Sequence, residues 1–529
     1  MAKKMVEERR IPRTMSTQHP DNASIPGWCS QELIQGEDEV YEAYFAYSIL
    51  GCQEVMWDAE GKDVDTRVMR KLLASHPHYF KKKIIGKDIF LTYRIPNPNV
   101  EFAERKIIIE TMANIPVGCD IASAFYKREV TPIFEVILPF TTSSRDIIGL
   151  YNYYRKGIVD IENVSLGNTL SVGQWLGRIR PDRIEVIPLI EDMDSLLRAD
   201  TILKPYVDMV RPRYVRVFLA RSDPALNYGL ISAVILNKLA LSKLRSLEEN
   251  RGLPIYPIIG VGSMPFRGHL SPDSLQGFLE EYRGVYTVTV QSALKFDYPK
   301  ERVKRLVKAL NEKLPCGKQV LIDSEEERLL LEGMKKFKIR YQQTTENLAP
   351  LINSVAIHVP ERRARMLHIG LYGYSRKVGK AILPRAIPFA TVLYSLGIPP
   401  EFIGFAASDC LDDDEWEVLR KYYVNMESDL KAVAGYTSWQ NINTLMNRYK
   451  KVADTARMKR ERLKMSLCSL MEDLNAVNER LRIKIGPNNL TEREYENTIC
   501  NFLIAYIKRE EKKAKRHLVE AAKIRRSLG

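Results

Sequence analysis

The sequence predicts an α/β protein, an elaborated (β/α)₈ barrel with additional helices and a helical C-terminal region. Three observations support this prediction. Apolar, β-rich segments alternate with helical patterns in the middle of the chain, several of these segments recur at intervals of roughly 30 residues, and strand signals stop after about residue 401. Apolar strands separated by helices are typical of a parallel sheet covered on both faces. A doubly wound open sheet is the alternative fold, although no GxGxxG motif follows a predicted strand.

The elements follow in chain order. The predicted strands are 133–139, 184–190, 214–219, 255–260, 286–290 and 366–371. The predicted helices between them include 226–248 and 272–282, and long helices at 412–433, 442–474 and 492–526 follow, each with apolar residues at helical spacing. We therefore expect a barrel-like catalytic region at 1–400, with an N-terminal catalytic loop, and a helical region at 401–529 packed on it.

Composition restricts the function classes. No apolar segment reaches the ~20 residues needed to cross a bilayer, and the charged N-terminus lacks a signal-peptide core. Seven scattered cysteines form no CxxC pair, so neither a zinc site nor a disulfide framework is indicated. The sequence therefore predicts a reduced, cytoplasmic protein without a membrane partner.

The net charge of +14 allows two interpretations. A basic surface can bind nucleic acid, or it can attract anionic metabolites to an active site. Much of the excess lies at 508–526, which has the pattern of a charged helix, and no RRM, KH or helix-turn-helix signature is present. We expect no nucleic-acid partner, and an RNA-binding or scaffold protein is the alternative.

Two carboxylates follow neighbouring predicted strands. Glu191 comes directly after the strand at 184–190, and Asp223 follows the strand at 214–219. The carboxyl ends of barrel strands form the active-site face, so both side chains would lie at the same mouth. Two carboxylates there suit a hard cation such as Mg²⁺. Alternatively, the acids cap the following helices, and Asp192 or Asp194 could replace Glu191.

Loops after other strands contain glycine or arginine. The segment GVGSMPFRG at 260–268 offers backbone amides and Arg267, and we expect Gly262 and Ser263 in it to bind substrate. Arg376 follows the strand predicted at 366–371, and Arg385 begins the next segment. Guanidinium groups at strand ends are suitable donors to phosphate and carboxylate. Taken singly, such loops are tight turns with surface charges, but their number beside two carboxylates favours an anion site.

His19 lies in the N-terminal segment STQHPDN at 16–22. A histidine placed between a polar turn and a proline can carry a proton near neutral pH. A structural or exposed histidine is the alternative, and the other six histidines show no metal-ligand spacing.

Together these segments resemble the archaeal-type phosphoenolpyruvate carboxylases. STQHPDN resembles that family's opening motif and the TAHPTE segment of the longer bacterial and plant enzymes, which contains their catalytic histidine. The segments PLIEDMDSL at 188–196 and ARSDPALNYG at 220–229 resemble PLFETLDDL and GYSDSAKDAG, which contain the metal-binding acids. The segments GVGSMPFRG, YSR at 374–376 and LPRAIP at 383–388 resemble HGRGGSIGRGG, GSR and LRAIPW.

The motif order matches over residues 19–388, but three positions differ from the long enzymes. The first arginine of their GRGG motif falls on Val261, and the lysine of SAKD falls on Leu226. No match to their upstream phosphate-binding arginine is found. Arg94 and Lys295 are the candidates for that missing charge.

The resemblance implies a Mg²⁺-dependent lyase, with Mn²⁺ as a possible substitute, that makes oxaloacetate from phosphoenolpyruvate and bicarbonate. It implies metal ligands at Glu191 and Asp223, catalytic residues at His19, Arg267 and Arg376, and a substrate-binding residue at Arg385. It also implies bicarbonate attack on phosphorus, decarboxylation of carboxyphosphate by His19, and addition of CO₂ to the enolate. An allosteric homotetramer that serves anaplerotic carbon fixation is expected. Another phosphoenolpyruvate-handling barrel enzyme, such as a pyruvate phosphotransferase, is the nearer alternative, although no nucleotide-binding loop is found.

Overall fold

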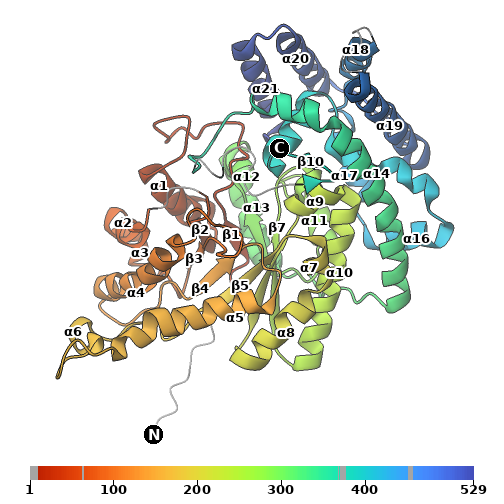
Figure 1. Cartoon of the computed structure of the whole chain (residues 1–529). Coiled ribbons are helices and arrows are strands. Elements are labelled where there is room, and N and C mark those ends of the chain that lie inside the picture. Colours follow the sequence, from red (N-terminus) through yellow and green to blue (C-terminus); the bar gives the residue numbers. More distant parts are fainter. Residues whose placement is uncertain (1–9, 62–64, 367–368, 370–376, 451–456) are drawn as a thin grey trace.

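A computed structural model describes residues 10–61, 65–366, 369, 377–450 and 457–529. Eight parallel strands form a closed barrel in sequence order, β1 to β8, and β8 pairs with β1 to complete it (Figure 1). The strands are β1 Thr14–Ser16, β2 Glu54–Asp58, β3 Phe90–Arg94, β4 Glu135–Leu138, β5 Glu185–Ile190, β6 Val215–Ala220, β7 Ile255–Gly260 and β8 Thr287–Val290. The predicted barrel is confirmed, and the open sheet is not found.

Helices surround the barrel and link its strands. In the barrel part these are α1 Glu37–Phe45, α2 Val68–Ser75, α3 Pro77–Phe80, α4 Ile107–Tyr126, α5 Ser144–Tyr153, α6 Val172–Leu176, α7 Met193–Leu197, α8 Ala199–Val210, α9 Ser222–Tyr228, α10 Leu230–Arg251, α11 Leu275–Glu281, α12 Ser292–Phe296 and α13 Lys300–Lys313. The later helices are α14 Ser324–Ala356, α15 Ala386–Ser395, α16 Asp413–Tyr422, α17 Met426–Ala434, α18 Trp439–Lys450, α19 Arg457–Leu481, α20 Leu490–Ile507 and α21 Glu511–Arg525. A small antiparallel pair, β9 Lys377–Val378 and β10 Ala381–Ile382, precedes α15.

Five of the six predicted strands are present, at β4 to β8, with bounds within two residues of the prediction. The sixth, 366–371, lies mostly outside the described residues, and Met366 and Ile369 are not in a strand. The predictions missed β1, β2 and β3. β1 has only three residues, and β2 and β3 include charged residues, such as Glu54 and Arg94, that face the barrel interior or its mouth.

The barrel interior contains one apolar and one ionic layer. The apolar layer is formed by Met15, Met56, Ile137, Ile187, Leu189, Phe218, Ala220 and Ile258. Nearer the amino ends of the strands, the buried guanidinium of Arg216 donates to Glu54 at 2.7 and 2.9 Å and to Glu135 at 2.7 Å. The even-numbered strands β2, β4 and β6 supply these three residues, as expected for one layer of a barrel of this kind. The barrel is therefore filled, and a ligand can enter only at the strand ends.

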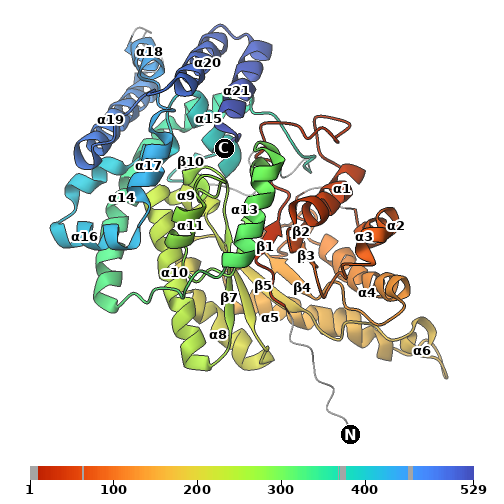
Figure 2. The ribbon, with the colours of Figure 1, turned by 180° about the vertical axis from the view of Figure 1, so that it is seen from behind.

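Several predicted helices are split. The region predicted at 226–248 is α9 and α10, separated at Gly229, whose φ of 88° interrupts the helix. Of the three long C-terminal predictions, 412–433 corresponds to α16 and α17, and 492–526 corresponds to α20 and α21. The prediction 442–474 covers parts of α18 and α19, and residues 451–456 between them lie outside the described residues. Figures 1 and 2 both show α18 to α21 beside one end of the barrel, with the C-terminal end of the chain between them and the barrel. The helical C-terminal region is thus confirmed, and the boundary at residue 400 stays a prediction.

Within the described part of the chain, α4 is the one helix that is long and apolar enough to cross a bilayer, and the bent pair of α15 and Pro400–Cys410 also passes that test. Only 33% of the apolar window of α4 is buried. Helices on the core of a soluble protein satisfy the same criterion, and α4 packs against α2 on the outside of the barrel. The absence of a membrane partner stays a prediction.

Candidate active site

A cavity of about 860 Å³ lies at the carboxyl ends of the barrel strands. All eight strands or the residues just after them contribute to its wall. The lining residues are Gln18, His19, Met56, Asp58, Glu60, Arg94, Phe140, Leu189, Glu191, Phe218, Ala220, Arg221, Ser222, Asp223, Gly260, Arg267, Gln291, Arg365, Arg385, Ala386 and Ile387. We call this the strand-end cavity. It contains the carboxylates, guanidinium groups and imidazole expected of an active site in this type of barrel.

The two predicted metal ligands line this cavity from adjacent strands. Glu191 directly follows β5, and Asp223 lies in the first turn of α9 after β6, which pairs with β5. The backbone N–H of Phe140 donates to Glu191 Oε2 at 2.8 Å, which orients this carboxylate. Asp192 is the N-cap of α7, and its carboxylate accepts from the Ser195 N–H at 3.0 Å. Asp192, and not Glu191, therefore caps α7.

The donor set at the strand ends fits a hard divalent cation. Two other acids in the cavity, Asp58 and Glu60, pair with Arg94 at 2.7 and 3.1 Å. Among the described residues no group of three or more His, Cys, Asp and Glu side chains could bind a metal ion. A site with only two carboxylates, Glu191 and Asp223, suits Mg²⁺ because this ion keeps several waters and takes substrate oxygens as further ligands.

Arg267 connects three of the sequence motifs. It is 1% exposed and donates to Ser222 Oγ at 3.0 Å, to Asp21 Oδ2 at 3.1 Å and to the Gly529 oxygen at 2.6 Å. It also donates to Gln291 Oε1. Asp21 belongs to the STQHPDN motif and Ser222 to the motif after β6. These contacts fix the guanidinium group in the cavity wall, and the sequence indicated none of the four partners.

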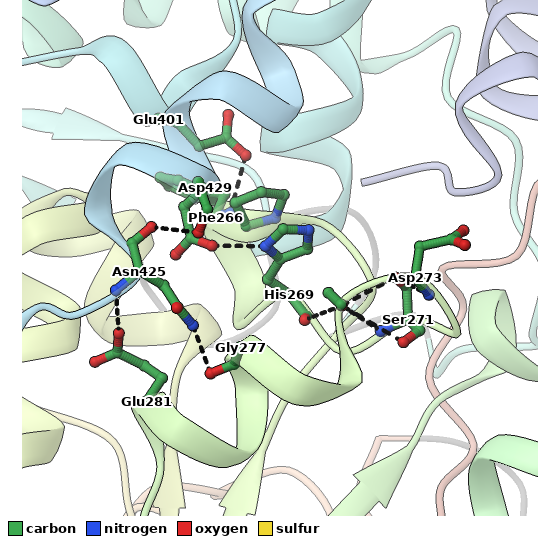
Figure 3. A network of polar contacts seen from close by, with 12 residues as sticks. Phe266, His269, Ser271, Asp273, Gly277, Glu281, Glu401, Asn425 and Asp429 are labelled. Atoms are coloured by element: carbon green, nitrogen blue, oxygen red, sulfur yellow. Dashed lines mark hydrogen bonds and ion pairs between the residues drawn. The ribbon is translucent and has the colours of Figure 1, made fainter. Parts of the chain in front are cut away.

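The loop that carries Arg267 is also fixed from its outer side, by residues of the C-terminal region (Figure 3). The Phe266 N–H donates to Glu401 at 2.9 Å, and His269 Nδ1 lies 2.6 Å from Asp429 Oδ1. Burial raises the pKa of Glu401 to about 7, against the effect of its hydrogen bonds. The C-terminal region therefore helps to determine the shape of the loop after β7.

Gly262 and Ser263 lie in the same loop but do not line the strand-end cavity. A Cβ atom at Gly262 would lie 3.1 Å from Arg267 Cζ and 3.2 Å from its Nη1. Gly262 therefore provides space for the guanidinium group, a role that differs from the substrate binding predicted for it. Ser263 is buried, and its predicted contact with substrate stays a prediction.

His19 lies at the start of the loop after β1, and its Nδ1 is 2.8 Å from Thr17 Oγ1. Burial lowers the pKa of His19 well below its usual value, and Arg267 and Arg94 lower it further. The imidazole is thus neutral at physiological pH. When Nδ1 carries the proton and donates to Thr17, Nε2 has its lone pair available to accept a proton.

The two candidates for the missing cation have different surroundings. Arg94 is the last residue of β3 and lines the strand-end cavity. Burial opposes its charge, but Asp58 and Glu60 raise its pKa. Lys295 is outside the lining set and fully buried, and its Nζ donates to Glu42 and the Thr17 carbonyl, both at 2.7 Å. Lys295 therefore lies beneath the His19 loop, and a direct role in substrate binding is unsupported by its position.

Arg385 lines the strand-end cavity, as the prediction of a substrate contact requires. Arg376 lies outside the described residues, and its catalytic assignment stays a prediction. The sequence reasoning missed Arg221 and Arg365, which also line the cavity. No recognised motif marked Arg365, and the preceding pair Arg362–Arg363 gave the only local signal of a basic segment.

Comparison with known proteins gave consistent results. A family model described as "Phosphoenolpyruvate carboxylase" matches residues 11–529. A phosphoenolpyruvate carboxylase of Metallosphaera sedula is 46% identical over 98% of this chain and 100% of its own length. Those of Caldivirga maquilingensis and Picrophilus torridus are 45% and 42% identical, again over 98% of this chain.

Proposed function

The chain belongs to the archaeal-type phosphoenolpyruvate carboxylase family, and we propose that it joins phosphoenolpyruvate and bicarbonate to form oxaloacetate and inorganic phosphate. The observation that carries this proposal is the strand-end cavity. It combines two carboxylates on adjacent strands, several guanidinium groups and a neutral histidine in one cavity. Phosphoenolpyruvate is densely anionic, and its reaction passes through an enolate, so cationic groups and a metal ion are the stabilisers that it needs.

Glu191 and Asp223 would hold Mg²⁺, for which Mn²⁺ can substitute, and the ion would supply positive charge to the oxygens of the substrate and of the enolate. The contacts of Arg267 with Asp21 and Ser222 orient its guanidinium group before substrate binds. A preoriented charge needs no rearrangement as charge develops in the transition state. Bicarbonate attacks phosphorus, the bond between phosphorus and the enol oxygen breaks, and the electron pair of that bond remains on the enolate.

His19 then acts on carboxyphosphate. Its neutral imidazole accepts the carboxyl proton at Nε2, the C–O bond to phosphate breaks, and CO₂ and inorganic phosphate form. The enolate carbon adds to CO₂ and gives oxaloacetate. The low pKa of His19 supports this role, because the ring must be unprotonated at the start of the step.

Other properties are proposed on the family resemblance. We propose a cytoplasmic homotetramer with allosteric regulation that serves anaplerotic carbon fixation. Sedimentation velocity of the purified protein tests the tetramer, since one chain has a mass of 60.8 kDa.

The metal site is tested by replacing its ligands. Glu191→Gln and Asp223→Asn keep the size of each side chain but remove the charge, so both variants should lose turnover and Mg²⁺ binding while their thermal unfolding changes little. Asp194→Asn is the matched control, because Asp194 is an exposed acid on α7 close to Glu191. Calorimetric Mg²⁺ titration and oxaloacetate formation are measured in parallel. Normal Mg²⁺ affinity and turnover in both ligand variants would refute the assignment.

A further inference from the structure

Two cavities meet beside His19. The second, of about 930 Å³, lies between the loop after β1, the segment 356–365 and the start of α15. It shares His19, Arg365, Arg385 and Ile387 with the strand-end cavity, and we call it the adjoining cavity. Its wall also includes Ile357, which is 69% exposed, so this cavity reaches the surface. A small ligand could therefore reach His19 without crossing the part of the site that contains Glu191 and Asp223.

Arg365 lies where the two cavities meet, and its charge is only partly compensated. Its Nη1 is buried and has no hydrogen-bond partner within the ranges that the structure describes. Burial and the nearby charges of Arg385 and Arg94 lower the pKa of Arg365 to about 9, although Asp58 and Glu60 act in the opposite direction. A buried donor without a partner and two neighbouring like charges are both costly, and an anion bound at this point would relieve both costs.

The other arginines at the mouth are engaged with the protein itself. Arg94 forms ion pairs with Asp58 and Glu60, and Arg267 donates to four groups of the chain, so their charges are largely satisfied before any substrate binds. Arg221 also has an unpartnered buried nitrogen, but it borders only the strand-end cavity. Arg365 therefore combines an unsatisfied donor with a position on both cavities, and none of these three arginines has both features.

The position of Arg365 distinguishes between the two anionic substrates. The metal-binding acids border the strand-end cavity only, and phosphoenolpyruvate must lie near them. The carboxyl group of carboxyphosphate, which loses its proton to His19, comes from bicarbonate, so bicarbonate must lie beside His19, where the cavities meet. Resting on the function proposed above, we infer that Arg365 binds bicarbonate at the junction of the two cavities, and that the adjoining cavity is its route from solvent.

The test compares Arg365→Gln and Arg365→Lys with the wild-type enzyme. Loss of a charge-assisted contact should raise the KM for bicarbonate at least about tenfold in Arg365→Gln, while the KM for phosphoenolpyruvate changes less than about threefold. Arg365→Lys keeps the charge and should give an intermediate KM for bicarbonate. Arg328→Gln is the control, because Arg328 lies on the exposed face of α14 and pairs only with surface acids. It should leave both KM values unchanged.

Equal rises in both KM values, or a rise for phosphoenolpyruvate alone, would overturn the bicarbonate assignment. If Arg365→Gln is too slow to assay, calorimetry with phosphoglycolate, an analogue of phosphoenolpyruvate, decides the matter. Wild-type affinity for phosphoglycolate supports the inference, and a tenfold loss overturns it. Absence of bicarbonate-dependent turnover in the wild-type enzyme would instead refute the proposed function, and this inference with it.

Discussion

At the scale of single residues, His19 carries the most specific chemical claim. Its role follows the attack of bicarbonate on phosphorus, so its loss should not prevent that attack. His19→Asn should therefore still release phosphate in a bicarbonate-dependent way, and the enolate, lacking CO₂, should be protonated to pyruvate. Lactate dehydrogenase and malate dehydrogenase assays on the same sample measure the two products.

A purely structural role for His19 predicts a different outcome, in which thermal stability falls and both products decrease together. His78→Asn is the control, because His78 is exposed on α3, outside both cavities. Oxaloacetate as the main product of His19→Asn would refute the catalytic role.

The surroundings of His19 also predict its titration. Burial, Arg267 and Arg94 lower its pKa, so the folded protein binds its proton less tightly than the unfolded chain does. The stability that this histidine contributes is complete above its unfolded pKa of about 6.5 and is lost as the pH falls below it. NMR titration, with the signal assigned by its absence in His19→Asn, should give a midpoint clearly below 6.5. A midpoint at or above 6.5 would contradict both the burial of the ring and the influence of the two cations.

The candidate residues could be predicted only where a motif marked them. Glu191, Asp223, His19 and Arg267 all line the strand-end cavity, and each lies in a segment that resembles a family motif. Arg365 could not be found in this way because its role depends on the meeting of two cavities formed by distant segments. The order of residues in one segment does not show which distant segments will meet in the fold.

At the scale of elements, the loop after β1 depends on a buried ion pair. Lys295 Nζ and the guanidinium of Arg363 both contact Glu42 at 2.7 Å. Although burial opposes it, these two cations lower the pKa of Glu42 to about 2, so the carboxylate is charged. Lys295 also donates to the carbonyl of Thr17, whose side chain contacts His19. These three charged groups thus help to fix the position of the loop that carries His19.

Lys295→Met should therefore destabilise the fold and slow turnover without a selective rise in the KM for phosphoenolpyruvate. The expected loss is about 1–3 kcal/mol, since Arg363 still compensates Glu42 but buried acceptors lose their donor. Thermal unfolding and steady-state kinetics measure both effects, and Lys308→Met, at an exposed position on α13, is the control. Unchanged stability together with a raised KM for phosphoenolpyruvate would instead support the prediction from the sequence that Lys295 binds substrate directly.

The strands show which elements a sequence pattern can reveal. β5, β6 and β7 are mostly apolar because helices cover them on one side and the apolar layer fills the barrel on the other, and their bounds were predicted closely. β2 and β3 escaped prediction because they contain Glu54, Asp58 and Arg94, which belong to the ionic layer or the cavity wall. These polar residues interrupt the apolar pattern by which a buried strand is predicted, and they lie in the barrel interior or at its mouth.

At the scale of the whole molecule, segments from both ends of the chain build one site. Asp21 near the amino end, Gln291 after β8 and Gly529 of the C-terminal region all contact Arg267. Asp429 and Glu401 contact the same loop from its other side (Figure 3). The sequence predicted a helical region packed on the barrel but gave no sign that its residues would hold Arg267 and the loop after β7 in place. These contacts join residues that are far apart in the chain, so they cannot be predicted from the spacing of residues within one segment.

The central claim is that this cavity carboxylates phosphoenolpyruvate, and one coupled assay tests it most directly. Purified protein is given phosphoenolpyruvate and Mg²⁺ with and without bicarbonate, and phosphate release and oxaloacetate formation are measured together, the latter with malate dehydrogenase. We predict equal amounts of both products, formed only when bicarbonate and the divalent cation are present. Formation of pyruvate and phosphate without any dependence on bicarbonate, or phosphoryl transfer to a nucleotide, would contradict the account.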